Sequence, residues 1–267
     1  MTLKEARTMV QTLRRSAPAA PADLAGGVLA GVGLVHEGAE VEGPIGPLLV
    51  AWSPKGITAV ERAVDALDFE TDYQLRHGRP LRRVPAMPPR MAEQVARRLR
   101  GEHGSGPQVD LAGRTAFEEA VLRATMAIPF GEVRPYAWVA REIGRPRAVR
   151  AVGSALAGNP VPFVIPCHRV VRTDGHIGEY GAGGPEAKRA VLAVEGVDTA
   201  ALERLAAAGT RFTGSDTTHI YCFPSCRHAR RTSAPHEVRF RSAEEAQRAG
   251  YRPCRVCRPL EASPFAA

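Results

Sequence analysis

Apolar residues recur at helical spacing in some stretches of the chain and form short runs around turns in others. Residues 1–13 carry apolar side chains three or four positions apart among charged ones, which predicts an amphipathic helix. The Pro/Ala-rich stretch 16–23 predicts a semi-rigid linker. Two short apolar runs within 48–60 surround a turn that contains Pro54 and Gly56. This pattern predicts a β-hairpin.

A helix follows the hairpin, with an apolar face formed by Met91, Val95 and Leu99. It should begin at the pair of prolines before this face and stop at Gly104, because proline suits a first helical turn and glycine ends helices. The hairpin and this helix predict a small α/β unit over 24–110.

Three short helices are predicted beyond the α/β unit, at 115–127, 135–143 and 148–157. A tight turn with Gly144 joins the second to the third, which indicates helix-turn-helix geometry. The third helix consists almost entirely of small residues, and Arg150 is its one long polar side chain. Such a helix reads few base edges but can approach DNA closely. The alternative is a helix-packing surface with a solvated arginine.

The composition is that of an ordinary soluble globular protein, with 44% hydrophobic and 24% charged residues. A length of 267 residues leaves room for two or three compact units. The net charge of +8 comes mostly from arginine, which favours a polyanionic partner, although an arginine-rich composition alone would give the same charge. Residues 1–15 lack the apolar core of a signal peptide, and the apolar run 24–35 is too short to span a bilayer. We therefore expect a cytoplasmic protein with no membrane partner.

One cysteine, Cys167, lies between Pro166 and His168 at the end of an apolar stretch. An unperturbed thiol pKa near ~8.5 makes ionisation at pH 7 cost about 2 kcal/mol, and a neighbouring histidine would lower that cost. Adjacent residues of a strand point to opposite faces, so contact between the two side chains needs a turn or a bridging water. Pro166 favours the turn. On these residues alone, a buried structural cysteine beside a satisfied histidine is the simpler interpretation.

Four further cysteines form two closely spaced pairs near the end of the chain. Cys222 and Cys226 are followed, after 27 residues, by Cys254 and Cys257. Two such pairs supply the four thiolates of a tetrahedral zinc site. Disulfides are the alternative, as is replacement of one ligand by His219, His228 or His236. A unit as small as 209–260 has little core, so metal binding should contribute much of its folding free energy.

Four motifs occur in a characteristic order, namely IPFGEVRPYAWVA, RPRAVRAVGSALAGNPVPFVIPCHRVV, GHIGEYGAGG and AVLAVEG. Over 113–196 this order closely resembles the O6-alkylguanine-DNA alkyltransferases, or methylated-DNA–protein-cysteine methyltransferases. The resemblance implies an α/β plus α architecture, with an RNase H-like domain at 24–110 and a winged-helix-like catalytic domain with a helix-turn-helix at 111–198.

The resemblance also implies a catalytic role for five residues. Cys167 would accept the alkyl group irreversibly, so that each molecule acts once. His168 would activate it through a water and be oriented by Glu195. Asn159 would brace the active-site turn, and Tyr136 would donate a hydrogen bond to the base.

The expected substrate is double-stranded DNA with alkylated guanine, and possibly O4-alkylthymine, bound by a monomer without an organic cofactor. Arg150 would fill the space left when the damaged nucleotide rotates out of the helix. The family's other DNA contacts fall on Tyr136, Ala151, Gly153 and Ser154, and its substrate contacts fall on Pro162, Val170 and Tyr180.

The C-terminal unit, 209–260, resembles the zinc-binding methyl-acceptor domain of the Ada protein, through THIYCFPSCRHARR and FRSAEEAQRAGYRPCRVCRP. The resemblance implies that Cys222 both binds zinc and accepts a methyl group from a DNA phosphotriester. A purely structural role for Cys222 is the alternative. We expect a linker at 199–208 and a tail at 261–267. Arginines that would balance the thiolate charge and hold phosphate are Arg227, Arg230, Arg231 and Arg252.

The resulting hypothesis is a nucleoid-associated DNA repair protein that transfers alkyl groups to Cys167. One rival is a non-catalytic protein that binds alkylated bases, and another is a methylation-sensing DNA-binding regulator. A hydrolase built on Cys167 and His168 is a more distant alternative.

Overall fold

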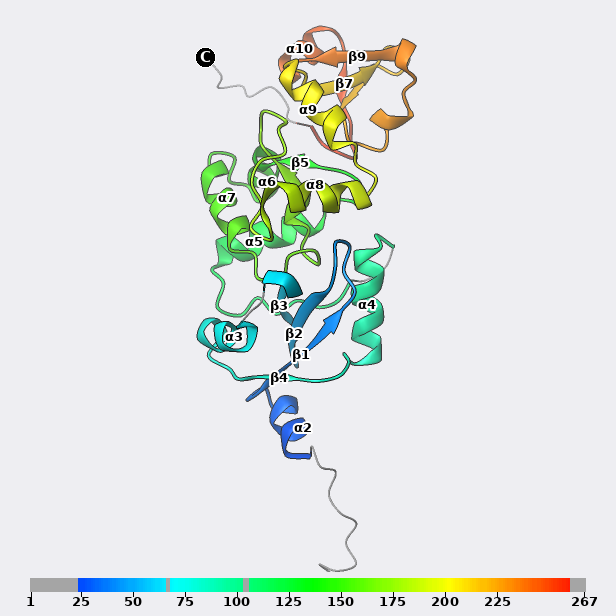
Figure 1. Ribbon diagram of the computed structural model, residues 1–267. Helices are drawn as coiled ribbons and strands as arrows, with labels where there is room; N and C mark the ends of the chain where they lie inside the picture. Colours follow the sequence, from blue (N-terminus) through cyan, green and yellow to red (C-terminus); the bar gives the residue numbers. More distant parts are fainter. Residues whose placement is uncertain (1–23, 66–67, 103–105, 260–267) are drawn as a thin grey trace, which may run out of the picture.

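The computed structural model describes residues 24–65, 68–102 and 106–259, which form three units arranged one after another along the long axis of the molecule (Figure 1). The α/β unit lies at one end, the unit with Cys167 is in the middle and the four-cysteine unit is at the other end. The predicted helix 1–13, the linker 16–23 and the tail 261–267 lie outside the described residues. Along the described part of the chain, no helix is both long and apolar enough to cross a bilayer.

The first unit is built on a four-stranded sheet of order β3-β2-β1-β4. β2 pairs antiparallel with both β1 and β3, so the predicted hairpin is confirmed, and β4 pairs parallel with β1. The elements of the unit are α2 (Leu24–Gly31), β1 (His36–Val41), β2 (Leu48–Ser53), β3 (Gly56–Arg62), η1 (Ala63–Asp65), α3 (Phe69–His77), β4 (Leu81–Arg83) and α4 (Pro89–Leu99).

The central strand β2 is buried on both faces because its alternate side chains enter two different cores. Leu48 and Val50 belong to the large core that also contains Val95 of α4. Leu49 packs instead with Phe69 of α3. The two helices therefore cover opposite faces of the sheet.

Helix α4 ends at Leu99. The sequence had predicted that it would end at Gly104. The chain leaves the helix at Gly101, whose φ of +71° is left-handed and suits glycine. The N–H of Glu102 then bonds to the carbonyl of Arg97 at 3.0 Å, which closes the helix end.

The middle unit contains the three predicted helices. α5 begins after a capping box in which Thr115 and Glu118 exchange hydrogen bonds, and α6 begins directly after Pro135. The elements are α5 (Ala116–Met126), β5 (Arg134–Pro135), α6 (Tyr136–Glu142), α7 (Val149–Ala157), η2 (Cys167–Arg169), β6 (Val170–Val171) and α8 (Gly184–Val194). β5 and β6 pair in parallel, which joins the entry of α6 to the residues after Cys167.

The stretch 199–208, expected as a linker, is instead occupied by helix α9 (Thr199–Ala207). The Asp198 side chain caps this helix by accepting a hydrogen bond from the Ala201 N–H at 2.7 Å. Leu202 packs against the small core around Leu192 and Val197. A cap and an apolar contact thus make the connection a folded element.

The C-terminal unit is a four-stranded sheet of order β10-β8-β7-β9 with one α-helix. Its elements are β7 (Phe212–Ser215), β8 (Ile220–Cys222), η3 (Ala229–Arg231), η4 (Ala234–His236), β9 (Glu237–Phe240), α10 (Ala243–Arg248) and β10 (Arg252–Pro253). Cys222 ends β8, and Cys254 follows β10, which pairs parallel with β8. This pairing brings the two cysteine pairs together.

Candidate functional site

Cys167 begins a single 3-10 turn, η2, directly after Pro166. The turn breaks the strand geometry that would have separated the cysteine from His168, as Pro166 had suggested. The side chain of Cys167 is 8% exposed and lines a cavity of about 250 Å³. Phe163, four residues earlier, has a φ of +69°, a left-handed conformation that costs a non-glycine residue about 1–3 kcal/mol.

Asn159 holds the loop that carries the cysteine. Its Nδ2 donates to the Sγ of Cys167 at 3.0 Å and to the carbonyl of Ile165 at 3.0 Å. Its Oδ1 accepts from the N–H of Val161, also at 3.0 Å. One side chain therefore fixes the turn and directs an N–H at the sulfur. The loop is also tied to the first unit, because the N–H of Val60 in β3 bonds to the carbonyl of Pro160 at 2.9 Å.

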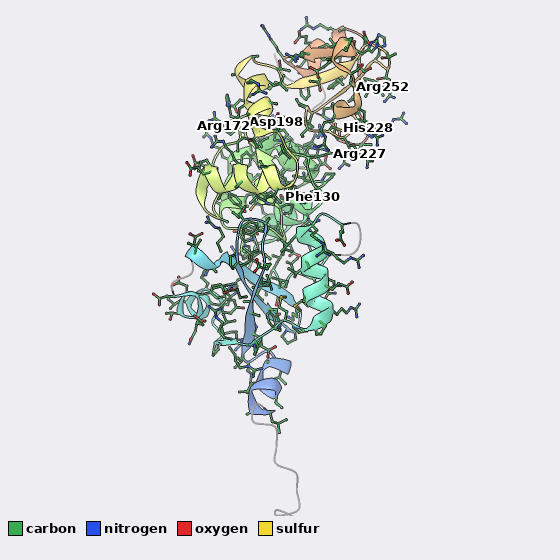
Figure 2. The ribbon with its side chains drawn as sticks, turned by 45° about the vertical axis from the view of Figure 1, so that its right-hand side comes forward. Phe130, Arg172, Asp198, Arg227, His228 and Arg252 are labelled. Atoms are coloured by element: carbon green, nitrogen blue, oxygen red, sulfur yellow. The ribbon has the colours of Figure 1, made fainter. Side chains whose placement is uncertain are left out.

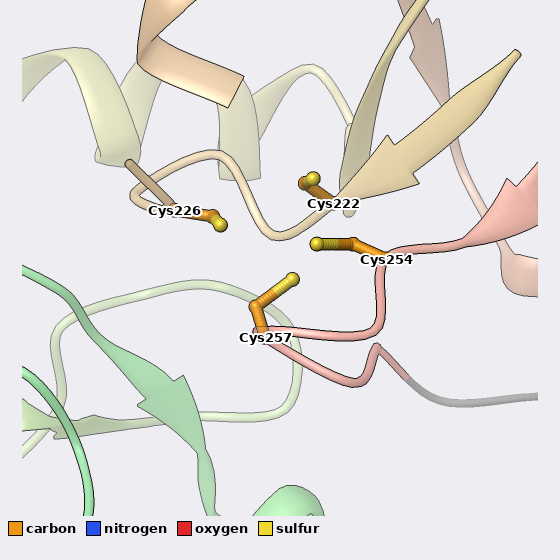
Figure 3. Close-up of side chains that lie close together, drawn as sticks. All are labelled: Cys222, Cys226, Cys254 and Cys257. Atoms are coloured by element: carbon orange, nitrogen blue, oxygen red, sulfur yellow. The ribbon is translucent and has the colours of Figure 1, made fainter. Parts of the chain in front are cut away.

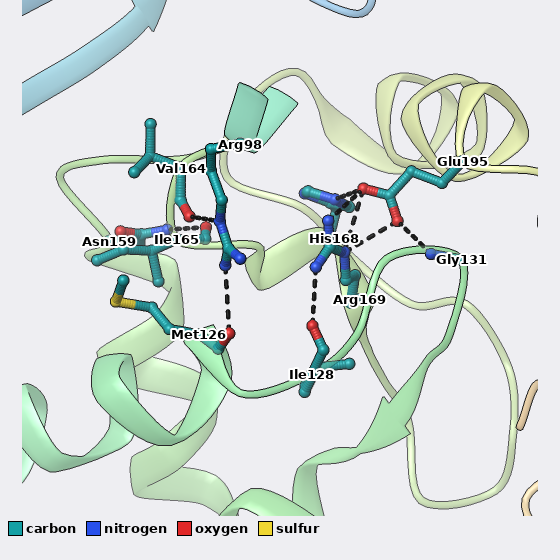
Figure 4. Close-up of polar contacts among 10 residues, drawn as sticks. All are labelled: Arg98, Met126, Ile128, Gly131, Asn159, Val164, Ile165, His168, Arg169 and Glu195. Carbon is teal, nitrogen blue, oxygen red and sulfur yellow. Dashed lines mark hydrogen bonds and ion pairs between the residues drawn. The ribbon is translucent and has the colours of Figure 1, made fainter. Parts of the chain in front are cut away.

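The two residues that follow the cysteine, His168 and Arg169, share one carboxylate, that of Glu195 (Figure 4). His168 Nε2 lies 2.8 Å from Glu195 Oε1, and Arg169 bonds to both carboxylate oxygens. The N–H of Gly131 donates to Oε2 at 3.1 Å. Glu195 lies at the C-terminal end of α8, and the side chains of Glu195, His168 and Arg169 are all buried. The carboxylate is therefore held by contacts with His168, Arg169 and Gly131, away from solvent.

Burial and hydrogen bonding set the protonation states of this group. Burial raises the pKa of the Cys167 thiol, against the donation from Asn159 that lowers it. Burial lowers the pKa of His168, against the nearby carboxylate that raises it. Burial alone would raise the pKa of Glu195, but the hydrogen bonds and charges of His168 and Arg169 hold it at about 2. At neutral pH the site therefore pairs a protonated thiol with a neutral histidine and an ionised glutamate.

Tyr136 is the first residue of α6 and is half-buried. Burial first, and then the nearby Cys167, raises the pKa of its phenol, which therefore remains a hydrogen-bond donor over the physiological range.

The predicted substrate residues have different surroundings. Pro162 lines the same cavity as Cys167, and the carbonyl of Val170 accepts a hydrogen bond from Lys188 Nζ at 2.6 Å. The Tyr180 ring lies edge-on to His168, with ring centroids 6.2 Å apart. Its buried hydroxyl has no hydrogen-bond partner within the described chain.

The opposite wall of the cavity comes from the first unit. Its charged side chains belong to the end of β3, to η1 and to α3, namely Glu61, Arg62, Asp65 and Arg76. No sequence pattern connects these residues with Cys167, because only the packing of β3 against the Pro160 loop brings them there.

Helix α7 places the predicted DNA contacts on its outer face. Arg150, Ala151 and Ser154 are exposed and Gly153 is partly buried, whereas Val152 is fully buried. The helix therefore packs through one face and presents a surface of small residues with one arginine to solvent.

Three cations of the site, of which Arg169 and Lys188 are buried and Arg98 is partly buried, were not identified from the sequence. Arg169 binds Glu195 and also donates to the Ile128 carbonyl at 2.7 Å. Lys188 bonds to the carbonyls of Val170 and Glu179, and burial lowers its pKa to about 8. Arg98 of α4 donates to Val164 and Met126. Arg169 could have been noticed as a charged residue inside the apolar run VIPCHRVV. Lys188 and Arg98 lie in ordinary helical patterns, so the sequence contains no comparable signal for them.

The four C-terminal cysteines converge, as predicted (Figure 3). All four are buried, and their sulfur atoms lie within 4.8 Å of one another. A tetrahedral zinc site with Zn–S bonds of about 2.3 Å requires sulfurs about 3.8 Å apart, so the set fits zinc. His219, His228 and His236 are not part of this group of ligand atoms.

Cys222 also lines a hollow on the surface of the C-terminal unit. Cations on this hollow are Arg231, Arg252 and Arg255, with His228 beside them. Figure 2 shows Arg227, His228 and Arg252 along one edge of the unit. The other zinc-binding cysteine of the first pair, Cys226, does not line the hollow and is fully buried.

Comparison with known families matches two parts of the chain. Residues 116–197 match the DNA-binding domain of 6-O-methylguanine DNA methyltransferase. Residues 199–260 match the metal-binding domain of Ada, so the match begins with helix α9. This match and the four buried cysteines establish one zinc ion as the metal of the C-terminal unit.

Related proteins share the name methylated-DNA–protein-cysteine methyltransferase. The relative from Methanosarcina barkeri is 36% identical over 145 residues, which are 54% of this chain and 87% of that protein. The rat relative is 51% identical over 85 residues, which are 32% of this chain and only 41% of the rat protein. Among solved structures, Mycobacterium tuberculosis OGT in complex with DNA has a TM-score of 0.50 and 31% identity, and the match covers 62% of this chain and 99% of that one.

Proposed function

Because the chain belongs to the methylated-DNA–protein-cysteine methyltransferase family, we propose that it repairs DNA by moving a methyl or other alkyl group from O6-alkylguanine to Cys167. The observation that carries the proposal is the set of contacts around one thiol. Asn159 donates to its sulfur, and the next residue along the chain, His168, is hydrogen-bonded to the buried Glu195. A structural cysteine needs neither group.

The proposed transfer is a single displacement. The sulfur of Cys167 forms a bond to the alkyl carbon while the bond between that carbon and guanine O6 breaks. The thiol proton passes to His168 through a water, and the departing guanine gains a proton, with Tyr136 as the donor facing the base. The thioether product is stable, so each molecule reacts once.

The protonation states of the site support this order of events. A thiol with a raised pKa needs a base, and a histidine with a lowered pKa is neutral and able to act as one. Nε2 of His168 is engaged by Glu195, which leaves Nδ1 for the proton. The imidazolium formed would be stabilised by the ionised Glu195.

We assign nucleotide flipping and duplex binding to α7. Its exposed face of small residues suits the close approach to a narrow groove, and Arg150 is the side chain long enough to enter the base stack. Binding through phosphate contacts independent of sequence suits a protein that must find damage anywhere.

The finer architecture is part of the same proposal. We assign residues 24–110 to an RNase H-like domain, 111–198 to a winged-helix-like catalytic domain with a helix-turn-helix, and 199–260 to an Ada-like zinc domain. The protein would act as a monomer on double-stranded DNA in the cytoplasm, associated with the nucleoid.

Mass spectrometry of the zinc-loaded protein after incubation with an O6-methylguanine duplex tests the proposal. The expected result is one added methyl group on the peptide with Cys167, and none in Cys167→Ser. Turnover of the substrate without modified protein would indicate a hydrolase. Binding of the duplex that is equally tight in Cys167→Ser, with no modification of the wild type, would indicate a non-catalytic binder.

A second acceptor at Cys222 is supported by the basic hollow that this cysteine lines. Zinc would keep the Cys222 thiolate deprotonated and nucleophilic. The sulfur would take the methyl carbon of a phosphotriester and release an anionic phosphodiester, while Arg231 and Arg252 hold the phosphate.

DNA that carries methyl phosphotriesters but no O6-methylguanine tests this second role. The expected product is a methyl group on the peptide with Cys222 in both the wild type and Cys167→Ser. An unmodified Cys222 would assign it a purely structural role. Footprints on one particular operator, strengthened by methylation, would instead support a regulator.

A further inference from the structure

The loop that holds the first two zinc ligands contacts the same segment that holds Glu195. This segment is Gly131–Val133, three consecutive residues before β5. Gly131 donates its N–H to Glu195 Oε2 at 3.1 Å. Its φ is +70°, and a Cβ at this position would lie 2.8 Å from the Glu195 carbonyl oxygen, so only glycine allows the approach.

The backbone N–H and the carbonyl of Val133 both form hydrogen bonds with one hydroxyl of the zinc loop, that of Ser225. The N–H of Val133 donates to Ser225 Oγ at 2.9 Å, and Ser225 Oγ donates to the carbonyl of Val133 at 3.1 Å. Ser225 is 4% exposed and directly precedes the zinc ligand Cys226. The two hydrogen bonds fix the position of Val133 relative to the zinc loop.

Glu132 is bound by the same loop. Its Oε1 accepts from the backbone N–H of Arg227 at 3.1 Å, and its Oε2 accepts from Arg134 at 2.5 Å. Glu132 and Arg134 are each 1% exposed, so the pair is closed to water. A buried ion pair tolerates little displacement, because a misplaced partner leaves a charge without compensation.

The second cysteine pair, Cys254 and Cys257, adds a further contact with the middle unit. The indole N–H of Trp138 in α6 donates to the carbonyl of the zinc ligand Cys257 at 3.0 Å. The Arg134 guanidinium lies over the rings of both Trp138 and Phe223, at 5.9 and 5.5 Å from their centroids. Both cysteine pairs are thus attached to the stretch from Gly131 to Trp138.

We propose that Ser225 and Glu132 are positioning residues for alkyl transfer, through which the zinc-bound loop sets the place of Gly131, Glu195 and His168. The inference rests on the proposed role of Cys167. The zinc unit is then more than an appended DNA-binding module, because its folded loop forms one wall of the support behind the reactive thiol. Displacement of Gly131 removes one hydrogen bond from Glu195 and lets the His168 ring turn away from the proton that it must accept.

The main test compares Ser225→Ala with the matched control Ser233→Ala, which removes an exposed hydroxyl from the same unit. Three quantities are measured in the full-length protein: zinc content, the rate of methyl transfer to Cys167, and the pH profile of Cys167 alkylation by iodoacetamide, followed on its peptide by mass spectrometry. The pH profile is included because a purely structural role would not move it.

For Ser225→Ala we expect one zinc per chain, as in the wild type, a methyl-transfer rate lower by about tenfold, and an iodoacetamide profile displaced to higher pH. Ser233→Ala should match the wild type in all three. A zinc-loaded Ser225→Ala protein with the wild-type rate and profile would overturn the proposal.

If Ser225→Ala loses zinc or fails to fold, Glu132→Gln decides by the same measurements, with the partly exposed Glu119→Gln as its control. A displaced profile in Glu132→Gln supports the positioning role, and an unchanged one contradicts it. If the wild type transfers no methyl group, the proposed function fails, but the iodoacetamide profile still decides whether the zinc loop positions His168.

Discussion

The side-chain amide of Asn159 lies 3.0 Å from the sulfur of Cys167 and donates to it. The same nitrogen binds the Ile165 carbonyl, and Oδ1 binds the Val161 N–H. Asn159 therefore braces the loop and directs a donor at the sulfur, and substitutions at this position test both contacts.

Asn159→Asp keeps the shape of the side chain and an oxygen for the Val161 N–H, but it replaces the nitrogen that donates to Cys167 and to the Ile165 carbonyl. We expect methyl transfer to slow by about 10- to 100-fold, the effect of losing a hydrogen bond to a developing charge. Asn159→Ala should lose a similar factor and also unfold at a lower temperature, because the loop loses its brace. Single-turnover kinetics and thermal melts provide the measurements, and a wild-type rate in Asn159→Asp would refute donation to the sulfur.

The free energy of unfolding should fall in acid because of Glu195. Its pKa is about 2 in the folded protein against an ordinary 4.5, so the native state favours the ionised form. This contribution, about 3 kcal/mol, is present above pH 4.5 and is lost as the pH falls toward 2. His168 acts in the same direction below its ordinary pKa of 6.5, because burial opposes its protonation in the folded state.

Urea unfolding between pH 7 and pH 2 checks this expectation in the wild type and in Glu195→Gln. The variant should be less stable at neutral pH and lose less stability on acidification. Parallel curves for the two proteins would show that the ionised Glu195 carboxylate makes no net contribution to stability.

Arg150→Ala should impair repair of duplex DNA without changing the fold. Arg150 is exposed on α7, so its removal leaves the core intact. Because flipping a base costs a few kcal/mol, we expect transfer from a duplex to slow by about tenfold and transfer from a single strand to change little. The control is Arg123→Ala, an exposed arginine of α5. An equal loss on both substrates would point to general phosphate binding instead of flipping.

Cys226→Ser should remove zinc and unfold the C-terminal unit. Cys226 is fully buried among the four sulfurs, and metal binding supplies folding free energy that the small core does not provide. Metal analysis and thermal unfolding measure the outcome. Cys167→Ser is the matched control and should keep one zinc per chain. A fully metal-loaded Cys226→Ser protein would contradict the four-thiolate site.

Local patterns along the chain predicted the four helices α4 to α7 and the first hairpin, but not the other helices of the described residues. Thr115 and Pro135 mark the starts of α5 and α6, because caps and prolines act within one helical turn. The prediction was wrong at the end of α4, where Gly101 and not Gly104 turns the chain. It was also wrong for the expected linker, because the packing of Leu202 that stabilises α9 depends on a core formed by distant residues.

The sequence by itself determined the four zinc ligands, because two closely spaced cysteine pairs identify them. It singled out Cys167 and His168 only through the order of the surrounding motifs, because the residues next to them suit a structural cysteine equally well. Only the tertiary structure decided what surrounds them. Arg169 and Gly131 meet Glu195 across 26 and 64 positions of the chain, and Ser225 meets Val133 across 92. Such contacts depend on how buried faces pack, and packing is shared by many residues that no local pattern connects. Cys167 could therefore be identified from the sequence, but the contact between the zinc loop and the segment that holds Glu195 could be identified only from the fold.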